Sequence, residues 1–188
     1  TSIQAGCKTT NLREVILRQM RARGLRCRCL RCRQVRDDAG GEWRLVRRDY
    51  DASGGTEVFL SIEDAATDRL AAFLRLRIPG DSMAGTPQGF SVLEHAALIR
   101  ELHTYGPHLP LHDRQDGAAQ HRGFGRRLLA DAERIAHDEF GRTWIAVIAG
   151  VGVRAYYRRL GYDLRDTYMV KTLPSACDSN GSCLDGTS

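Results

Sequence analysis

The sequence predicts an α/β fold in which helices flank a mixed central sheet, after an N-terminal helical and Cys-rich linker. Short strand-like runs dominate the first half of the chain. A Gly-x-Gly pair then stands directly before a helix-periodic run, and strands and helices alternate from there on. The expected strands are residues 43–48, 57–62, 70–78, 96–105, 143–148 and 168–171, and the expected helices are residues 11–23, 153–160 and a run that begins at Phe124.

The third expected strand shows the clearest alternation. Ala72, Leu74, Leu76 and Ile78 alternate with Phe73, Arg75 and Arg77. Period-two patterns of this kind are typical of a sheet with one buried and one solvated face.

Arginine dominates the basic residues. The 188-residue chain has a net charge of +5, and its lysines are Lys8 and Lys171. Codon bias in a high-GC genome explains an arginine excess equally well, but clustering in one N-terminal segment favours an RNA-backbone contact. That cluster consists of Arg13, Arg18, Arg21, Arg23, Arg26, Arg28, Arg31, Arg33 and Arg36.

Targeting signals are not recognisable. No run approaches the roughly 18 apolar residues of a membrane helix, and no secretory signal precedes the domain. We therefore expect a cytoplasmic protein.

The expected first helix has start and stop signals. Asn11 with Glu14 reads as a capping box, and Gly24 ends the helix. Its expected buried stripe consists of Leu12, Val15, Ile16 and Met20.

Cys27, Cys29 and Cys32 form a local cluster that favours a metal over a disulfide in a cytosolic protein. Thiolates suit zinc, which needs four ligands, so Cys7, a histidine or a solvent-side ligand could complete the site. The alternative is three reduced thiols in an arginine-rich turn. We assign no role to Cys177 and Cys183, which lie in a polar tail. The expected organisation is a linker over residues 1–36, an α/β domain over 37–173 and a disordered tail over 174–188.

Residues 120–127, Gln-His-Arg-Gly-Phe-Gly-Arg-Arg, are the strongest candidate binding motif. Gly123 and Gly125 would let the backbone approach a ligand closely, and the following helix would direct free N–H groups at a phosphate. Arg122, Arg126 and Arg127 add positive charge. The buried face of that helix would consist of Phe124, Leu128, Leu129, Ala132, Ile135 and Ala136.

The order Gln-x-x-Gly-x-Gly followed by a helix resembles the acetyl-CoA signature of the GNAT acetyltransferases. The later segment Gly152-Val-Arg-Ala-Tyr-Tyr-Arg-Arg-Leu-Gly-Tyr162 resembles their last helix, in which a tyrosine reaches the thioester. Adjacent helical positions cannot both face the core, so at least one of Tyr156 and Tyr157 should be available.

The resemblance extends to the catalytic subunit of Elongator, from about Asn11 to Lys171. Matching segments are Asn11–Glu14, Cys27–Arg33, Phe73–Arg77, Arg100–Gly106, Gln120–Gly125, Ala132–Ala136 and Gly152–Tyr162. The resemblance implies a GNAT fold, acetyl-CoA as cofactor and a role in modifying the tRNA wobble uridine.

That family joins a radical-SAM domain to a C-terminal acetyltransferase domain. This chain resembles the C-terminal half and has no Cys-x-x-x-Cys-x-x-Cys motif. The resemblance therefore implies a radical-SAM domain in cis or in trans, which would carry the iron–sulfur cluster and S-adenosylmethionine, and Elongator-type subunits as further partners.

The family's site residues carry over by motif. Tyr156 and Tyr157 would lie near the thioester, as catalytic residues, and Tyr157 would also contact the cofactor. Glu101 and His103 share one strand face, so either could act as a general base, whereas a structural histidine is the simpler role for His103. The expected cofactor-binding residues are Glu101, Leu102, His103 and Thr104 on the strand edge, with Gln120, Arg122, Gly123, Phe124, Gly125 and Arg126 in the loop.

Two other functions fit parts of the pattern. A protein lysine N-acetyltransferase would share the cofactor loop without needing an RNA surface. A non-enzymatic zinc and RNA-binding module would bind tRNA but not acetyl-CoA.

Overall fold

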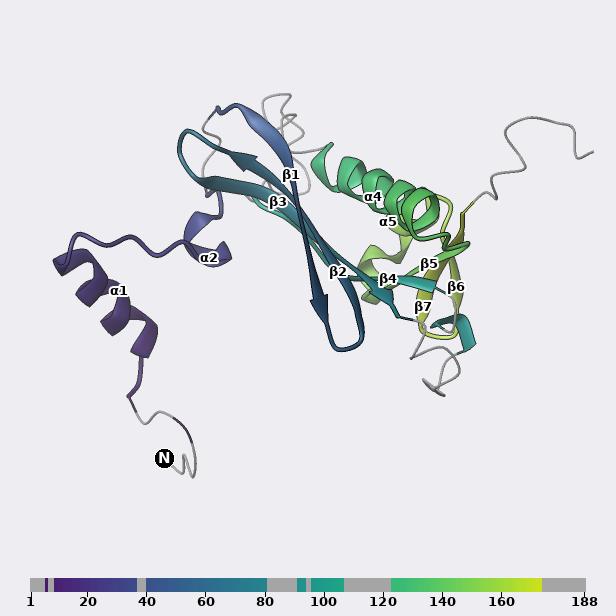
Figure 1. Ribbon diagram of the computed structural model, residues 1–188, viewed down its shortest axis with the longest axis horizontal. Coiled ribbons are helices and arrows are strands. Elements are labelled where there is room, and N and C mark those ends of the chain that lie inside the picture. The colour runs from purple at the N-terminus through teal and green to yellow at the C-terminus, as the bar shows by residue number, and fades with distance from the viewer. Residues whose placement is uncertain are drawn as a thin grey trace, which may run out of the picture. The chain divides into compact units, whose positions relative to one another are not determined.

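The computed structural model describes Gly6 and residues 9–36, 40–80, 91–93, 96–106 and 123–173. The chain divides into two compact units, Thr1–Gln34 and Val35–Ser188. Figure 1 shows the elements of both units. The tail expected over residues 174–188 lies outside the described residues.

The described residues of the first unit form two helices, α1 (Leu12–Ala22) and the single turn α2 (Leu30–Arg33). The predicted capping box is wrong. Asn11 adopts a left-handed conformation with φ 57°, and its side chain makes no capping hydrogen bond. Its carbonyl oxygen instead accepts hydrogen bonds from the backbone N–H groups of Glu14 and Val15.

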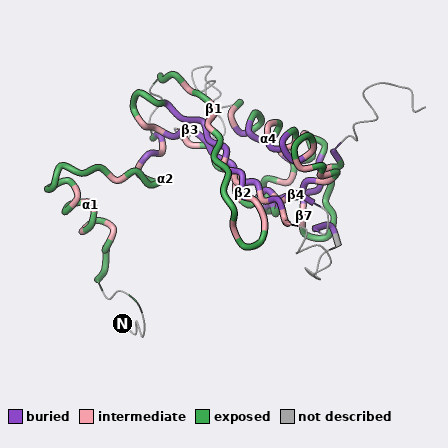
Figure 2. The backbone as a smooth tube through the Cα atoms, in the orientation of Figure 1, coloured by how far each residue is buried: buried purple, intermediate pink, exposed green. Residues whose placement is uncertain are grey.

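The predicted buried stripe of α1 is also wrong. No residue of α1 is buried, and Leu12 and Ile16 are 41% and 45% exposed. Figure 2 shows α1 without buried residues. A short helix in so small a unit has little apolar surface to pack against. The predicted end is confirmed, because Gly24 adopts φ 68° directly after the helix and Leu25 N–H donates to Met20 O.

The second unit is built on a seven-stranded sheet with the order β1-β2-β3-β4-β5-β7-β6. Only β4 and β5 pair in parallel among these strands. The mixed sheet confirms the predicted α/β class, although the short β6 was not predicted. The strands are β1 (Trp43–Ala52), β2 (Gly55–Asp64), β3 (Arg69–Pro79), β4 (Ala96–Thr104), β5 (Trp144–Ile148), β6 (Asp163–Arg165) and β7 (Tyr168–Thr172).

Strands β1 and β2 form a tight hairpin. Ser53 and Gly54 both have positive φ, 45° and 69°, as a two-residue turn matching the strand twist requires. Gly55 follows because a Cβ there would collide with the carbonyl oxygen of Ile78. The Ser-Gly-Gly run is the local signal for this turn.

One face of the sheet packs against α4 (Phe124–Arg134), which continues as a π-helical turn over Ile135–Glu139. Figures 1 and 2 show α4 along this face, with its buried side toward the strands. The predicted helix face is confirmed, with five residues buried and Phe124 half-buried. The buried residues are Leu128, Leu129, Ala132, Ile135 and Ala136.

A shorter helix, α5 (Arg154–Arg158), follows a 3-10 turn at Val151–Val153. Gly161, with φ 85°, ends this segment as predicted, and Tyr162 N–H donates to Tyr157 O. Tyr157 and Tyr162 join the same core as α4. None of the helices in the described part of the chain is long and apolar enough to cross a membrane.

The opposite face of the sheet is mixed. Near β5 and β7 it carries a small apolar cluster that includes Val92, Ala146 and Val170. On β3 the predicted alternation is confirmed for Leu74 and Leu76, which face the α4 core, and for Arg75 and Arg77, which lie half-buried on the other side. Phe73, which was also expected on the solvated face, is instead 3% exposed.

Candidate functional site

Strands β4 and β5 separate part-way along their length. They pair from Ala96 opposite Trp144 to Ile99 opposite Val147. Beyond that point β4 continues to Thr104, and among the described residues this part of β4 pairs with β3 alone. The register with β3 shifts at Arg100, because Leu76 pairs with Ile99 and Arg75 pairs with Glu101. This bulge re-aims β4 and leaves one backbone edge of Glu101–Thr104 available to a ligand.

Three predicted site residues converge beside that edge. A Cβ placed on Gly125 would lie 3.3 Å from Thr104 Cγ2 and 3.4 Å from the Tyr156 hydroxyl oxygen. The first turn of α4, the end of β4 and α5 therefore meet at Gly125. A larger residue would crowd both neighbours.

The two motif glycines differ in role. Gly123 has φ −94° and ψ −20°, which other residues adopt readily, and a Cβ there meets nothing within 4 Å. Neither glycine has a positive φ, so what distinguishes the two positions is the space around the missing side chain. Gly123 borders open space, whereas Gly125 is a close-approach position.

The N-terminus of α4 has the properties of an anion site. Helix geometry directs the first backbone N–H groups of a helix away from its own carbonyl groups. Arg126 and Arg127 are exposed at this end of α4. Phe124 is anchored edge-on against Trp43, with ring centroids 6.2 Å apart. Gln120 and Arg122, which the motif also implicates, lie outside the described residues.

The two tyrosines of α5 occupy different environments. Tyr157 is 6% exposed and packs edge-on against Tyr162. Tyr156 is half-buried, and its hydroxyl lies beside Gly125. Burial raises the pKa of Tyr156, against the opposing charges of Arg126 and Arg159, and burial likewise raises the pKa of Tyr157. Tyr156 is thus the phenol at the candidate site, and Tyr157 is mainly a core residue.

Strand β4 presents its predicted residues to two faces. Leu102 packs with the α4 core and Thr104 lies beside Gly125. Glu101 and His103 share the other face, as predicted. Glu101 Oε2 lies 3.5 Å from Arg75 Nε. The His103 ring centroid lies 5.1 Å from that of Phe73. Both side chains lie on the face opposite Leu102 and Thr104, and a general-base role for either one stays a prediction.

The first unit brings the three predicted thiols together. The sulfur atoms of Cys27, Cys29 and Cys32 all lie within 4.8 Å of one another. Arg13 donates a hydrogen bond to Cys32 Sγ at 3.0 Å. The pKa of Cys29 is lowered to about 6, first by the Cys32 backbone N–H and then by Cys27 and Arg13. Burial raises the pKa of Cys32.

Sequence reasoning missed a partly buried polar link near the site. Tyr162 donates a 2.8 Å hydrogen bond to Glu133 Oε1, and Lys171 contacts Glu133 Oε2 at 2.7 Å. These contacts join α4, the turn after α5 and β7. These three residues are far apart in the sequence and share no short-range pattern. The sequence therefore predicts the helix or strand near each residue but not the contacts among them.

Comparisons with known proteins identify relatives of this chain, although no family model matches it. The chain is 51% identical over 140 residues to the tRNA uridine(34) acetyltransferase of Dehalococcoides mccartyi, covering 74% of this chain and 30% of that protein. It is 49% identical over 129 residues to human Elongator complex protein 3, covering 69% and 23% of the two chains.

A solved structure agrees with these sequence matches. The archaeal Methanocaldococcus infernus Elp3 with an N-terminal deletion superposes with a TM-score of 0.72 and 43% identity, covering 88% of this chain and 40% of that one. This chain is a relative of one part of the Elongator catalytic subunit family. With the seven-stranded mixed sheet, that likeness confirms the expected α/β fold with a mixed central sheet. The chain spans less than a third of the length of these curated relatives.

Proposed function

We propose that this chain is an acetyl-CoA-dependent acyltransferase domain that acts in the modification of the tRNA wobble uridine, U34. The observation that carries the proposal is the open edge of β4 beside Gly125, Thr104 and Tyr156. A relative named tRNA uridine(34) acetyltransferase, 51% identical, supports the choice of substrate.

The chain's own residues fit coenzyme A in two places. Backbone N–H groups at Gly123–Arg126, with the Arg126 guanidinium, would bind the pyrophosphate, and Gln120 and Arg122 belong to the same proposed loop. The free edge of Glu101–Thr104 would hydrogen-bond the pantetheine amides, as an added strand does. Bound acetyl-CoA would supply an activated acetyl group.

Tyr156 is the proposed acid. Because burial raises its pKa above the ordinary value, the phenol keeps its proton at neutral pH and can donate it to a departing thiolate. Tyr157, buried behind it, would hold the Tyr156 ring in place through their edge-on contact, with centroids 5.3 Å apart.

RNA and further protein partners complete the proposal. The N-terminal arginine cluster supplies charge for a tRNA backbone. A radical-SAM domain, in cis or in trans, would complete uridine modification and would carry the iron–sulfur cluster and S-adenosylmethionine. Elongator-type subunits are proposed as additional partners, and the cytoplasm as the location.

Cys27, Cys29 and Cys32 are proposed ligands of a structural zinc. Their sulfur atoms are close enough to share one ion, and a low Cys29 pKa favours the thiolate that a metal needs. They supply three of the four ligands of a tetrahedral site.

Acetyl-CoA binding and turnover test the function. We expect calorimetry to detect acetyl-CoA binding by the chain, and added tRNA to raise the rate of CoA release. Amine acetylation that is indifferent to tRNA would indicate a protein acetyltransferase instead. Folded protein that does not bind acetyl-CoA would rule out acyl chemistry at this site.

A further inference from the structure

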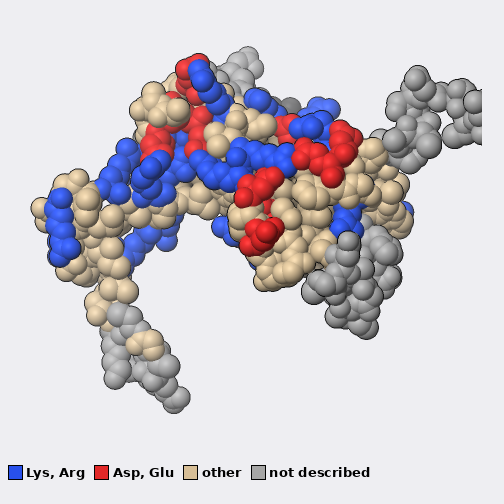
Figure 3. Space-filling model, viewed as in Figure 1, with Lys and Arg blue, Asp and Glu red and all other residues tan. Residues whose placement is uncertain are grey.

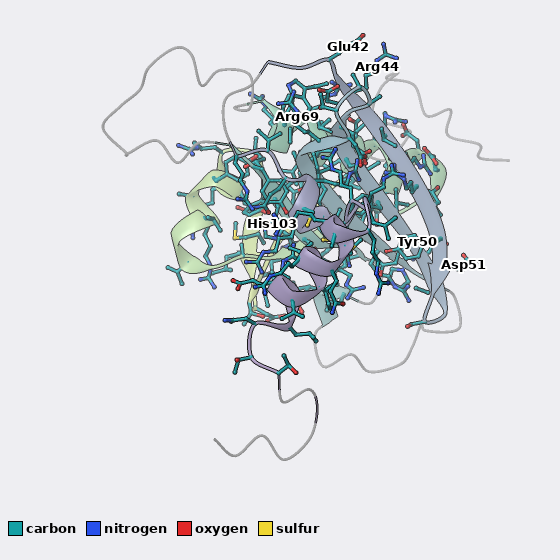
Figure 4. All side chains as sticks on the ribbon, turned by 90° about the vertical axis from the view of Figure 1, so that its left-hand side faces the viewer. Glu42, Arg44, Tyr50, Asp51, Arg69 and His103 are labelled. Carbon is teal, nitrogen blue, oxygen red and sulfur yellow. The ribbon has the colours of Figure 1, made fainter. Side chains whose placement is uncertain are left out.

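A second surface of the sheet carries rings and cations together. It lies on the face opposite α4, where β1–β4 present the residues that alternate with the buried core. Figure 4 labels His103 of β4 together with Arg44 and Tyr50 of β1. We call this surface the arginine–aromatic face and define it by Arg48, Phe59, Phe73, Arg100, His103 and Tyr105.

The rings form one continuous stack across three strands. Phe59 stacks on Phe73 at 5.5 Å between centroids, and Phe73 contacts His103 at 5.1 Å. His103 lies nearly parallel to Tyr105, with a 9° interplanar angle and 6.3 Å between centroids. Phe73 is buried under its neighbours, whereas the His103 ring is exposed at the outer side of the stack.

The charges of this face are layered. Glu57 is 3% exposed beneath Arg100, whose side chain is 52% exposed and lies 2.7 Å from the carboxylate. Glu63 is 9% exposed beneath Arg48, which is 51% exposed and also 2.7 Å away. The carboxylates of Glu57 and Glu63 are therefore hidden while the guanidinium groups above them reach solvent. Glu101, on the same face, is 41% exposed and lies beside Arg75. The face keeps a net positive charge, because Arg48, Arg75, Arg77 and Arg100 outnumber these three carboxylates.

The opposite side of the unit lacks this layering. Arg47, on β1, bonds the half-exposed carboxylates of Asp49 and Glu139. Figure 3 shows basic and acidic side chains intermixed over the strands and α4 in its view.

We propose that the arginine–aromatic face binds unpaired nucleotides of RNA, with bases stacking on His103 and Phe59 and phosphates held by Arg48 and Arg100. Sites for single-stranded nucleic acid combine aromatic platforms with a cationic groove, as this face does. A protein partner would favour a core depleted in charge. The inference rests on the proposed function, in which tRNA is the RNA, and it adds a second contact surface to the N-terminal arginine cluster.

Photocrosslinking locates the contact directly. An unstructured oligouridylate that contains 4-thiouridine is bound to the 188-residue chain, irradiated and mapped by mass spectrometry. We expect crosslinked peptides that contain Phe59, His103 or Tyr105. Crosslinks found only in other peptides would overturn the proposal and would leave this face to a protein partner.

Substitutions test the energetics of the same contact. His103→Ala and Phe59→Leu should each weaken oligouridylate binding about fivefold or more, because each removes a stacking ring. Arg48→Gln and Arg100→Gln should each make oligouridylate binding less dependent on salt. The negative slope of log association constant against log salt concentration should become shallower by about 0.7 for each substitution. Arg134→Gln is the matched control, since it removes an arginine that is 55% exposed on α4.

Two further measurements keep the result interpretable. Thermal unfolding identifies any variant that misfolds. Arg100→Gln carries this risk, because it removes a positive charge that pairs with the buried Glu57 carboxylate. If a variant misfolds, its binding data are discarded and the crosslinking result decides. Acetyl-CoA affinity is measured on Arg48→Gln and Phe59→Leu, where we expect no change. If every folded variant binds oligouridylate as tightly as Arg134→Gln does, the inference is refuted. If the unsubstituted chain does not bind acetyl-CoA, the proposed function is refuted instead.

Discussion

Gly125 is the residue at which the candidate site is most tightly determined. Its missing side chain lets the first turn of α4 approach both Thr104 and the Tyr156 hydroxyl. Any Cβ would have to displace one of these neighbours by a few tenths of an ångström. The close approach sets the position of the helix amides relative to the edge of β4.

Gly125→Ala should therefore weaken acetyl-CoA binding. We expect a Kd raised about tenfold, since overpacking of a close contact costs about 1–3 kcal/mol. Isothermal calorimetry measures the change. Gly152→Ala is the control, because a Cβ at Gly152 meets nothing within 4 Å. Equal affinities of the two variants would show that the Gly125 contact does not position the site.

Tyr156 is expected to act as a proton donor. Tyr156→Phe should lower tRNA-stimulated CoA release about 100-fold, within the usual range for loss of a general acid. The comparison variant is Tyr157→Phe, which we expect to have the smaller effect because Tyr157 lies in the core. Similar losses in both variants would argue for a packing effect.

The pH dependence follows from the direction of the pKa shift. A phenol with a raised pKa is protonated below its ordinary pKa of about 10 and loses its proton only above it. Turnover should therefore show no decline caused by Tyr156 between about pH 7 and pH 9. A loss of activity in that range that disappears in Tyr156→Phe would contradict the assignment.

At the level of elements, the site depends on two departures from a regular sheet. The bulge at Arg100 bends β4, and the pairing with β5 ends at Ile99 opposite Val147. The link from Glu133 to Tyr162 and Lys171 then ties α4 to the α5 turn and β7. Helix, strand and tyrosine are thereby held in one arrangement.

Glu133→Ala should destabilise the second unit. It leaves the fully buried Tyr162 hydroxyl without its acceptor, which costs about 1–3 kcal/mol of unfolding free energy. Tyr162→Phe should cost less, because it removes the donor and leaves Glu133 paired with Lys171. Urea denaturation compares the two variants, and an equal or greater loss in Tyr162→Phe would disprove the argument.

On the scale of the whole molecule, the proposed metal ligands and the proposed cofactor site belong to different units. The three thiols belong to Thr1–Gln34, and the open β4 edge belongs to Val35–Ser188. Arginine is present in both, in the N-terminal cluster and on the arginine–aromatic face. RNA contact is the property that the two units share in this proposal.

Elemental analysis tests the metal. Protein purified without a histidine tag should contain about one zinc per chain, and Cys29→Ser should lower that content. Cys183→Ser is the control, since no role is assigned to that thiol. A metal-free preparation with unchanged stability would return Cys27, Cys29 and Cys32 to ordinary reduced thiols.

The sequence by itself determined the features that are encoded in short windows. The α/β class, the buried face of α4 and the stop at Gly161 all follow from local periodicity and glycine placement. The candidate cofactor loop follows from the spacing of two glycines before a helix.

Only the tertiary structure decided which residues meet. The end of the β4–β5 pairing at Ile99 and the close approach of Gly125 to Thr104 and Tyr156 each depend on segments that are distant in the chain. Local patterns carry no information on such non-local register. The same reason explains the errors at α1, where an amphipathic pattern predicted burial but the small first unit offers little surface to bury it against.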